Sequence, residues 1–296
     1  MRPFGYRITT LFVFIIILIA VFIINPNSKA SSHNSAKIQS NKLVKIETRS
    51  GVTQKFIIIK PSDPVASVIL FTGGKGKIGL GSFSGKPTVK SRGIFSQARE
   101  DFARNGLIVA LVHAPSDQQQ KFGMNKILKE SNEPFRVSNK HVQDIKAIIS
   151  YLKNEANIPI WLVGHSMGTF SASNGAIHIK DGVDGLVLLS SVTRKPPKWK
   201  TFKAYPNGIL TMGFDKITVP TLIAFHKDDK CPGSPAMDAP EIKKALVNSP
   251  AVEVVYFSGG KKPGPEPCHW KAAHGFYGIE NQVVSAIVDF IKSNSK

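Results

Sequence analysis

The feature that most constrains the fold is a regular alternation of short apolar runs with amphipathic stretches along residues 43–296. Apolar runs of five to seven residues, rich in Val, Ile and Leu, predict buried strands at 66–71, 107–112, 158–163, 185–189, 221–225 and 251–257. Apolar residues at helical spacing predict amphipathic helices at 95–105, 141–154 and 279–291. Such alternation builds one α/β domain, with a mostly parallel central sheet and helices on both faces.

The chain enters this pattern through an expected antiparallel pair of strands, 43–48 and 54–59, joined by a turn at Arg49-Ser50-Gly51. In a parallel sheet the carboxyl ends of the strands share one edge, and ligands bind in the loops beyond it. We therefore expect the functional residues in those loops.

The first thirty residues have the layout of an export signal. Arg2 and Arg7 precede an unbroken apolar run over 11–24, which a short polar stretch ending at Ala30 follows. We interpret 1–30 as a cleaved signal peptide or an uncleaved N-terminal anchor, which would associate the protein with a membrane. Residues 31–42, rich in Ser, Asn and Lys, are expected to form a flexible linker. The domain is then exported, either periplasmic or secreted.

The charge balance is strongly basic, with 39 Lys and Arg residues against 20 Asp and Glu. The first thirty residues hold three of the basic residues and no acid, so the remainder stays basic without them. The lysines are scattered and accompany no zinc-finger or RNA-recognition motif, so we expect no nucleic-acid partner. A surface that binds another polyanion remains an alternative reading of this charge.

The sharpest motif is Gly164-His165-Ser166-Met167-Gly168, which directly follows the predicted strand 158–163 and precedes a small-residue helical stretch, 169–179. A G-x-S-x-G motif between a strand and a helix exposes its serine on a tight turn, and glycines are needed where strand and helix approach closely. The alternative is a glycine-rich turn with a capping serine.

An acid and a histidine follow Ser166 in the order that such a serine requires. Asp228 and Asp229 come directly after the strand 221–225, and His274 lies before the last helix. The intervals leave room for strands and helices between them. His269 competes with His274 as the base, although its position beside Cys268 and Trp270 favours a structural or substrate-lining role.

With these motifs the chain resembles a serine hydrolase of the α/β-hydrolase superfamily over residues 43–296. The resemblance rests on the GHSMG segment, on TLIAFHKDD and on the HGF segment, and extends to VILFTGGKG. It implies an α/β-hydrolase fold, with Ser166 as nucleophile, His274 as base and Asp229 as the acid. Asp228 is the alternative acid, because a turn aspartate can instead cap local amides.

The same resemblance implies an oxyanion hole made of the backbone amides of Gly74 and Met167. Thr72 stands where many members of the superfamily have a histidine, which leaves the choice of Gly74 open. No metal and no organic cofactor are implied.

Two further features surround the expected triad. Cys231 lies two residues after Asp229 and Cys268 six before His274, a placement that resembles an exported bacterial branch and, with export, favours a disulfide between them. Residues 191–219 interrupt the alternation, with paired prolines and several lysines, and are interpreted as a short cap or lid.

The sequence therefore predicts an exported serine hydrolase that cleaves a small carboxylic ester, or a thioester or amide, through an acyl-enzyme on Ser166. Two other classes remain open. One is a hydrolase-fold protein that binds a ligand without turnover, and the other is a basic surface protein that binds a polyanion.

Overall fold

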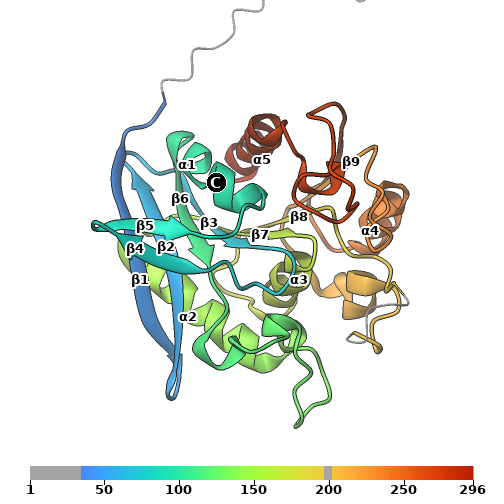
Figure 1. Ribbon diagram of the computed structural model, residues 1–296, viewed down its shortest axis with the longest axis horizontal. Coiled ribbons are helices and arrows are strands. Elements are labelled where there is room, and N and C mark those ends of the chain that lie inside the picture. Colours follow the sequence, from blue (N-terminus) through green and yellow to red (C-terminus); the bar gives the residue numbers. More distant parts are fainter. Residues whose placement is uncertain (1–34, 197–201, 296) are drawn as a thin grey trace, which may run out of the picture. The chain divides into compact units, whose positions relative to one another are not determined.

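An eight-stranded sheet organises the residues that the structure, a computed structural model, describes: 35–196 and 202–295 (Figure 1). Its strands, in spatial order, are β1 (Ile38–Arg49), β2 (Val52–Pro61), β6 (Leu107–Val112), β3 (Ala66–Phe71), β7 (Ile160–His165), β8 (Gly185–Leu189), β9 (Thr221–His226) and β10 (Val252–Phe257). The helices are α1 (Ile94–Arg104), α2 (Asn139–Glu155), α3 (Gly168–His178), α4 (Ala239–Ala245) and α5 (Glu280–Asn294).

Six neighbouring strands, β6 to β10 in the spatial order above, run parallel to one another. At one edge β2 pairs antiparallel with both β1 and β6. The carboxyl ends of β3, β7, β8, β9 and β10 consequently open at one side of the molecule. The predicted mostly parallel α/β sheet is confirmed.

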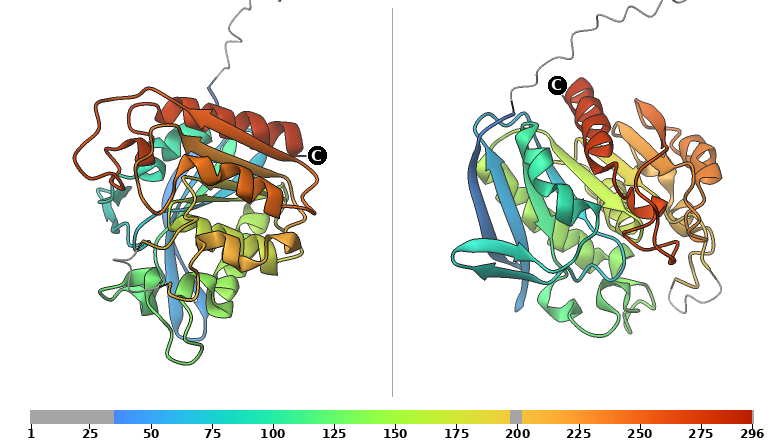
Figure 2. Two further views of the ribbon diagram at one scale, coloured as in Figure 1. Left: turned by 90° about the vertical axis from the view of Figure 1, so that its right-hand side faces the viewer. Right: turned by 45° about the horizontal axis from the view of Figure 1, so that its top comes forward.

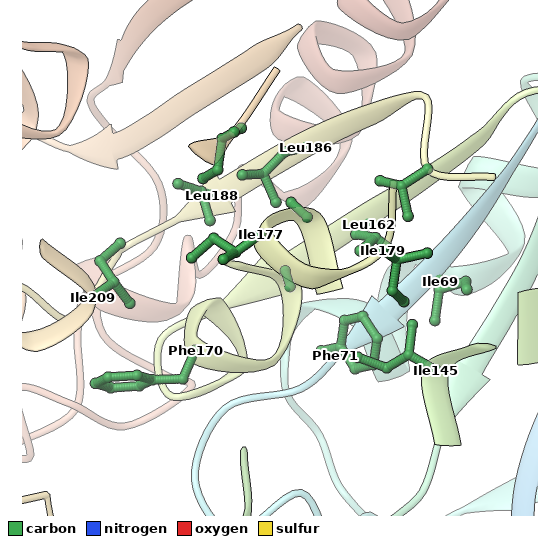
Figure 3. Close-up of a cluster of buried hydrophobic side chains, with 14 of the residues drawn as sticks. Ile69, Phe71, Ile145, Leu162, Phe170, Ile177, Ile179, Leu186, Leu188 and Ile209 are labelled. Atoms are coloured by element: carbon green, nitrogen blue, oxygen red, sulfur yellow. The ribbon is translucent and has the colours of Figure 1, made fainter. Parts of the chain in front are cut away.

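Two apolar cores lie on the two faces of this sheet, because successive strand residues point to opposite sides. Ile69 and Phe71 of β3 face the core that α2, α3 and α4 cover, a part of which Figure 3 shows. Val68 and Leu70 face the core that α1 and α5 cover, and these two helices lie side by side in Figure 2. Helices on both faces were the expected arrangement.

The folded domain begins earlier than the sequence indicated. Strand β1 starts at Ile38, where Ile38 pairs with Pro61 and Lys42 with Ile58, so residues 38–42 belong to the sheet and the linker prediction is wrong for them. Polar side chains misled the prediction because β1 is an edge strand that alternates between partly covered and exposed residues. The predicted signal peptide or anchor, and residues 31–34 of the linker, lie outside the described residues.

A β-hairpin and a short helix were not predicted from the sequence. A hairpin forms between β4 (Leu80–Phe83) and β5 (Lys86–Val89), where Ser84 and Gly85 take the positive φ angles, 48° and 75°, of a tight two-residue turn. Helix α4 is only seven residues long and has a proline in its first turn. The strands of the hairpin and this helix are too short for a pattern of apolar residues to stand out in the sequence.

The described part of the predicted cap packs onto the domain. Within 202–219, Phe202, Ile209 and Phe214 are buried in the same core as α3, and the rings of Phe202 and Phe170 are 4.5 Å apart. Ile209 and Phe214 belong to two short 3₁₀ helices, Gly208–Met212 and Phe214–Lys216. Residues 197–201 lie outside the described part, and the role of 191–219 as a lid stays a prediction.

No helix in the described ranges combines the length and the apolar character that crossing a membrane requires.

Candidate active site

Ser166 lies at the point where β7 turns into α3. Its φ angle is +54°, in the left-handed region that non-glycine residues seldom adopt. Its amide donates to the Leu189 carbonyl of the neighbouring strand at 2.9 Å, and its carbonyl accepts from the Thr169 amide at 2.9 Å. The strained turn is thus fixed by hydrogen bonds on both sides, as expected for a serine presented above a sheet.

Both glycines of the motif are there for steric reasons. A Cβ on Gly168 would lie 1.9 Å from the Phe71 carbonyl oxygen at the end of β3, and one on Gly164 would lie 2.6 Å from the Gly168 carbonyl oxygen. Any side chain at either position would push the helix away from the sheet. The sequence argument that strand and helix approach too closely for a side chain is therefore met by the geometry.

His274 is held by a buried carboxylate from another loop. Its Nδ1 lies 2.9 Å from Asp229 Oδ2, and both side chains are buried, at 2% and 0% exposure. Asp229 Oδ1 accepts from the Cys231 amide at 2.8 Å, which fixes the second oxygen. Because Nδ1 is directed at the carboxylate, Nε2 is the nitrogen left to exchange a proton with a hydroxyl group.

The structure separates the two neighbouring aspartates. Asp228 is 75% exposed, and its Oδ2 lies 3.9 Å from His226 Nδ1. Its amide donates to the same His226 nitrogen at 3.0 Å, so Asp228 belongs to a local turn. His269 lies exposed beside Trp270. The carboxylate that contacts His274 is therefore Asp229, while Asp228 and His269 lie outside this pair.

The backbone of His274 is also tied to the serine turn. Its carbonyl oxygen accepts from His165 Nε2 at 2.8 Å and from Ser190 Oγ at 3.0 Å. Burial, together with the nearby His274, lowers the pKa of His165 to about 3, so this imidazole is neutral at neutral pH and Nε2 carries its proton. His165, the variable residue of the motif, thus links the nucleophile turn to the histidine loop.

The expected disulfide between Cys231 and Cys268 is present, with the two Cα atoms 4.7 Å apart. It joins the loop of Asp229 to the loop of His274. A cross-link across 37 residues restricts the separation of these loops in the folded chain and the freedom of the unfolded chain.

The two residues whose amides are expected to form an oxyanion hole lie on either side of Ser166, Gly74 in the pocket wall and Met167 next in the chain. Gly74 lines the pocket beside Ser166, and the position of a Cβ on the preceding Gly73 is 3.0 Å from Ser166 Cβ. Met167 opens helix α3, with its side chain in the core and its amide at the helix start. Within 35–196 and 202–295, neither the Gly74 nor the Met167 amide donates a hydrogen bond to another backbone group.

Ser166 and His274 line one cavity of about 200 Å³. The loop after β3 (Thr72 to Gly74) forms one wall, and the start of α1 with Ile94 and Phe95 forms another. Cys268 and Trp270 complete the lining from the histidine loop. The lining is mixed, with the apolar side chains of Ile94, Phe95 and Trp270 beside polar groups such as Thr72 and Ser91, as in a site for a small organic ligand.

Three contributors to this arrangement were missed by sequence reasoning. Ser234 Oγ lies 3.1 Å from His274 Nδ1, and Ser190 holds the His274 carbonyl. Arg136 is 1% exposed and donates to the loop after β3. Serines are common in loops and give no distinct signal, whereas an arginine between Phe135 and Val137 is a charge in an apolar context.

No cluster of three or more His, Cys, Asp or Glu side chains suited to a metal ion occurs in the described part of the chain.

Comparison with known proteins agrees with this architecture. Residues 134–254 match the family model described as serine aminopeptidase, S33. No curated protein was found to match the chain. The matched residues include Ser166 and Asp229, so this part of the chain is similar to that serine-hydrolase family. The doubly covered, mostly parallel sheet has the α/β-hydrolase fold.

Solved structures show the same fold at low sequence identity. An esterase of Pyrococcus furiosus is 16% identical, with a TM-score of 0.58 over 87% of this chain and 92% of that one. A highly thermostable carboxyl esterase from Bacillus coagulans is 14% identical, with a TM-score of 0.56 over 86% and 99% of the two chains. A dienelactone hydrolase from Anabaena variabilis is 12% identical, with a TM-score of 0.56 over 87% and 99%.

Replacing both cysteines of the disulfide by alanine is expected to lower the free energy of unfolding by up to about 4 kcal/mol, because the unfolded chain regains the freedom of the closed loop. Denaturant unfolding of the double variant measures this loss. The wild type in reducing agent should lose as much, and the double variant should not respond to the reductant. An unchanged unfolding midpoint in the double variant would contradict the prediction.

Proposed function

We propose that this protein is a serine hydrolase that cleaves a small carboxylic ester through an acyl-enzyme formed on Ser166. The observation that carries the proposal is the buried pair of Asp229 and His274, 2.9 Å apart, in the pocket that Ser166 lines. A buried carboxylate behind an imidazole, beside a serine on a strained turn, is the arrangement that makes a hydroxyl nucleophilic.

In the first half of the reaction, His274 Nε2 takes the proton of Ser166 Oγ while that oxygen forms a bond to the acyl carbon. Asp229 holds the imidazole in the required tautomer and stabilises the imidazolium. The carbonyl oxygen becomes an oxyanion facing the amides of Gly74 and Met167. Collapse of this intermediate breaks the bond to the leaving alcohol, which receives the proton from His274.

In the second half, a water molecule takes the place of the alcohol. His274 accepts a proton from the water as its oxygen bonds to the acyl carbon, and the same two amides again face the oxyanion. Breakage of the acyl bond to Ser166 Oγ returns the proton to the serine and releases a carboxylic acid. The chain's own residues account for every proton in both halves.

The size of the pocket supports a short substrate. Its volume of about 200 Å³ lies below the roughly 300 to 1,000 Å³ of most sites for small molecules. Ile94, Phe95 and Trp270 give the walls an apolar character. A short, uncharged acyl group fits this space and chemistry. Thioesters and amides of such acids are the related substrates that the same reaction would take.

Export is part of the proposal. The layout of residues 1–30 supports passage out of the cytoplasm, and the disulfide beside the active site supports an oxidising compartment. We place the protein in the periplasm or outside the cell, with the N-terminal segment as the means of membrane attachment if it is retained.

Covalent labelling tests the proposed chemistry. A fluorophosphonate should label the wild-type protein and not Ser166→Ala, because phosphonylation needs the activated hydroxyl. Gel fluorescence and the mass of the intact protein measure the modification. Absence of labelling in the wild type, or equal labelling of both proteins, would reject the proposed nucleophile and the proposed function with it.

The adjacent aspartates offer a matched pair of variants. Asp229→Asn should lower kcat/KM by about 10²- to 10⁴-fold, because an amide behind the imidazole favours the wrong tautomer. Asp228→Asn, one residue away and 75% exposed, should change kcat/KM by less than about twofold. Steady-state kinetics on one chromogenic ester compares them. Equal effects of the two substitutions would contradict the assignment of the acid.

A panel of chromogenic esters of graded acyl length tests the pocket. With a constant leaving group, kcat/KM should be highest for acyl chains of about two to four carbons and fall for longer chains, because the cavity is smaller than most sites for small molecules. Ser166→Ala, run beside the wild type, gives the background rate. A maximum at long acyl chains would show that the lining described above does not bound the acyl group.

A further inference from the structure

Arg136 is a buried cation that the reaction scheme does not use. Arg136 belongs to a short 3₁₀ helix, Phe135–Val137, and is 1% exposed. Among the described residues it has no carboxylate partner, in contrast to Arg49, which pairs with Asp117 and Asp144. Burying an arginine without an opposite charge costs desolvation free energy. The hydrogen-bond acceptors of Arg136 therefore indicate why it is buried there.

Those acceptors are concentrated at the loop that supplies one half of the oxyanion hole. Arg136 Nη2 donates to the carbonyl oxygens of Thr72 and Gly74, at 3.2 and 3.1 Å. The Gly73 carbonyl between them accepts from the Gly76 amide at 3.3 Å. All three consecutive peptide units of this loop are thereby held by donors on their carbonyl side.

This bonding also orients the donor that the substrate would meet. In a trans peptide the N–H points opposite to the C=O. The Gly73 carbonyl is directed at the Gly76 turn, so the Gly74 N–H of the same peptide unit is directed away from that turn. Arg136 fixes the peptide units on either side of it, which leaves this N–H little freedom to rotate.

Arg136 reaches the other half of the oxyanion hole as well. Its Nη1 donates to Ser171 Oγ at 2.7 Å, in the first turn of helix α3, whose start supplies the Met167 amide. Its Nε donates to Asn125 Oδ1 at 3.0 Å, and Asn125 Nδ2 in turn donates to the Gly74 carbonyl at 3.1 Å. One guanidinium therefore connects the loop after β3 to the helix after Ser166.

We propose that Arg136 is the positioning residue of the oxyanion hole: it holds the Gly74 amide and helix α3 in register, and its positive charge stabilises the oxyanion from behind the loop. The inference rests on the proposed function, because an oxyanion arises only if acyl transfer takes place. Preorganised donors in a buried site contribute most when they need no rearrangement during the reaction.

The charge is present under ordinary conditions. Burial lowers the pKa of Arg136 to about 9, which still leaves the guanidinium protonated at neutral pH. Fixed in place and screened from solvent, it acts at a lower effective dielectric than a surface cation would. Arg136 does not line the cavity and contacts no substrate atom, so it acts by positioning the Gly74 and Met167 amides and by the electric field of its charge.

Two substitutions separate the geometry from the charge. Arg136→Met keeps a long side chain but removes all its hydrogen-bond donors. Arg136→Lys keeps the positive charge, but its single ammonium group cannot bond to all four acceptors of the guanidinium. We expect kcat per active site to fall by about 10- to 100-fold in Arg136→Met, with KM within about threefold of wild type. Arg136→Lys should lie between it and the wild type. Active-site titration gives the number of competent sites, so misfolded protein does not enter kcat.

Arg49→Met is the matched control, because Arg49 is also a largely buried arginine and packs over Phe135, next to Arg136, but its hydrogen bonds go to Asp117 and Asp144 and not to residues 72–76. It should lose stability yet keep kcat per titrated site within about twofold of wild type. A second readout is affinity for a trifluoromethyl ketone, whose adduct carries the oxyanion. This affinity should fall in parallel with kcat/KM in the Arg136 variants only.

The outcomes are distinct. A wild type that neither hydrolyses esters nor reacts with the fluorophosphonate overturns the proposed function and this inference together. An active wild type with Arg136→Met and Arg49→Met equal in kcat per site, or equal in affinity for the ketone, overturns the inference alone. Should Arg136→Met fail to fold, Arg136→Lys decides in the same way: wild-type values in both readouts overturn the inference, and a fall in both supports it.

Discussion

The close approach of three backbone segments is the constraint on which the rest of the site depends. The end of β3, the end of β7 and the start of α3 meet so tightly that Gly164 and Gly168 have no room for a Cβ. This contact forces Ser166 into a left-handed conformation and brings the loop after β3 beside it. The nucleophile and the amides around it are therefore placed by backbone packing, which side-chain motion cannot relax.

The position of His274 is set by contacts at both ends of the residue. Asp229 holds the ring through Nδ1, while His165 and Ser190 hold the backbone carbonyl. The disulfide joins the two loops that carry the acid and the base. Because His165 belongs to the serine turn, the base loop and the nucleophile turn are one connected structure, and displacement of either would disturb the other.

Buried polar groups of this region are used for orientation. His165 remains neutral, and its one ring N–H donates a hydrogen bond to the His274 carbonyl. Arg136 carries a charge with no carboxylate partner in the described structure and directs its donors at Thr72, Gly74, Ser171 and Asn125. Such groups cost desolvation energy, and their retention beside the site is understandable if they fix a geometry that apolar residues cannot.

The sequence by itself determined the features that arise from local patterns. Its apolar periodicity indicated the sheet and the main helices, and G-x-S-x-G between a strand and a helix indicated the serine turn. Tertiary structure decided what depends on residues far apart in the chain. Edge strand β1 extends to Ile38 because β2 pairs with it, and Asp229 rather than Asp228 reaches His274 because adjacent side chains point in different directions. Arg136 meets Thr72 across 64 residues, a contact that no local spacing encodes.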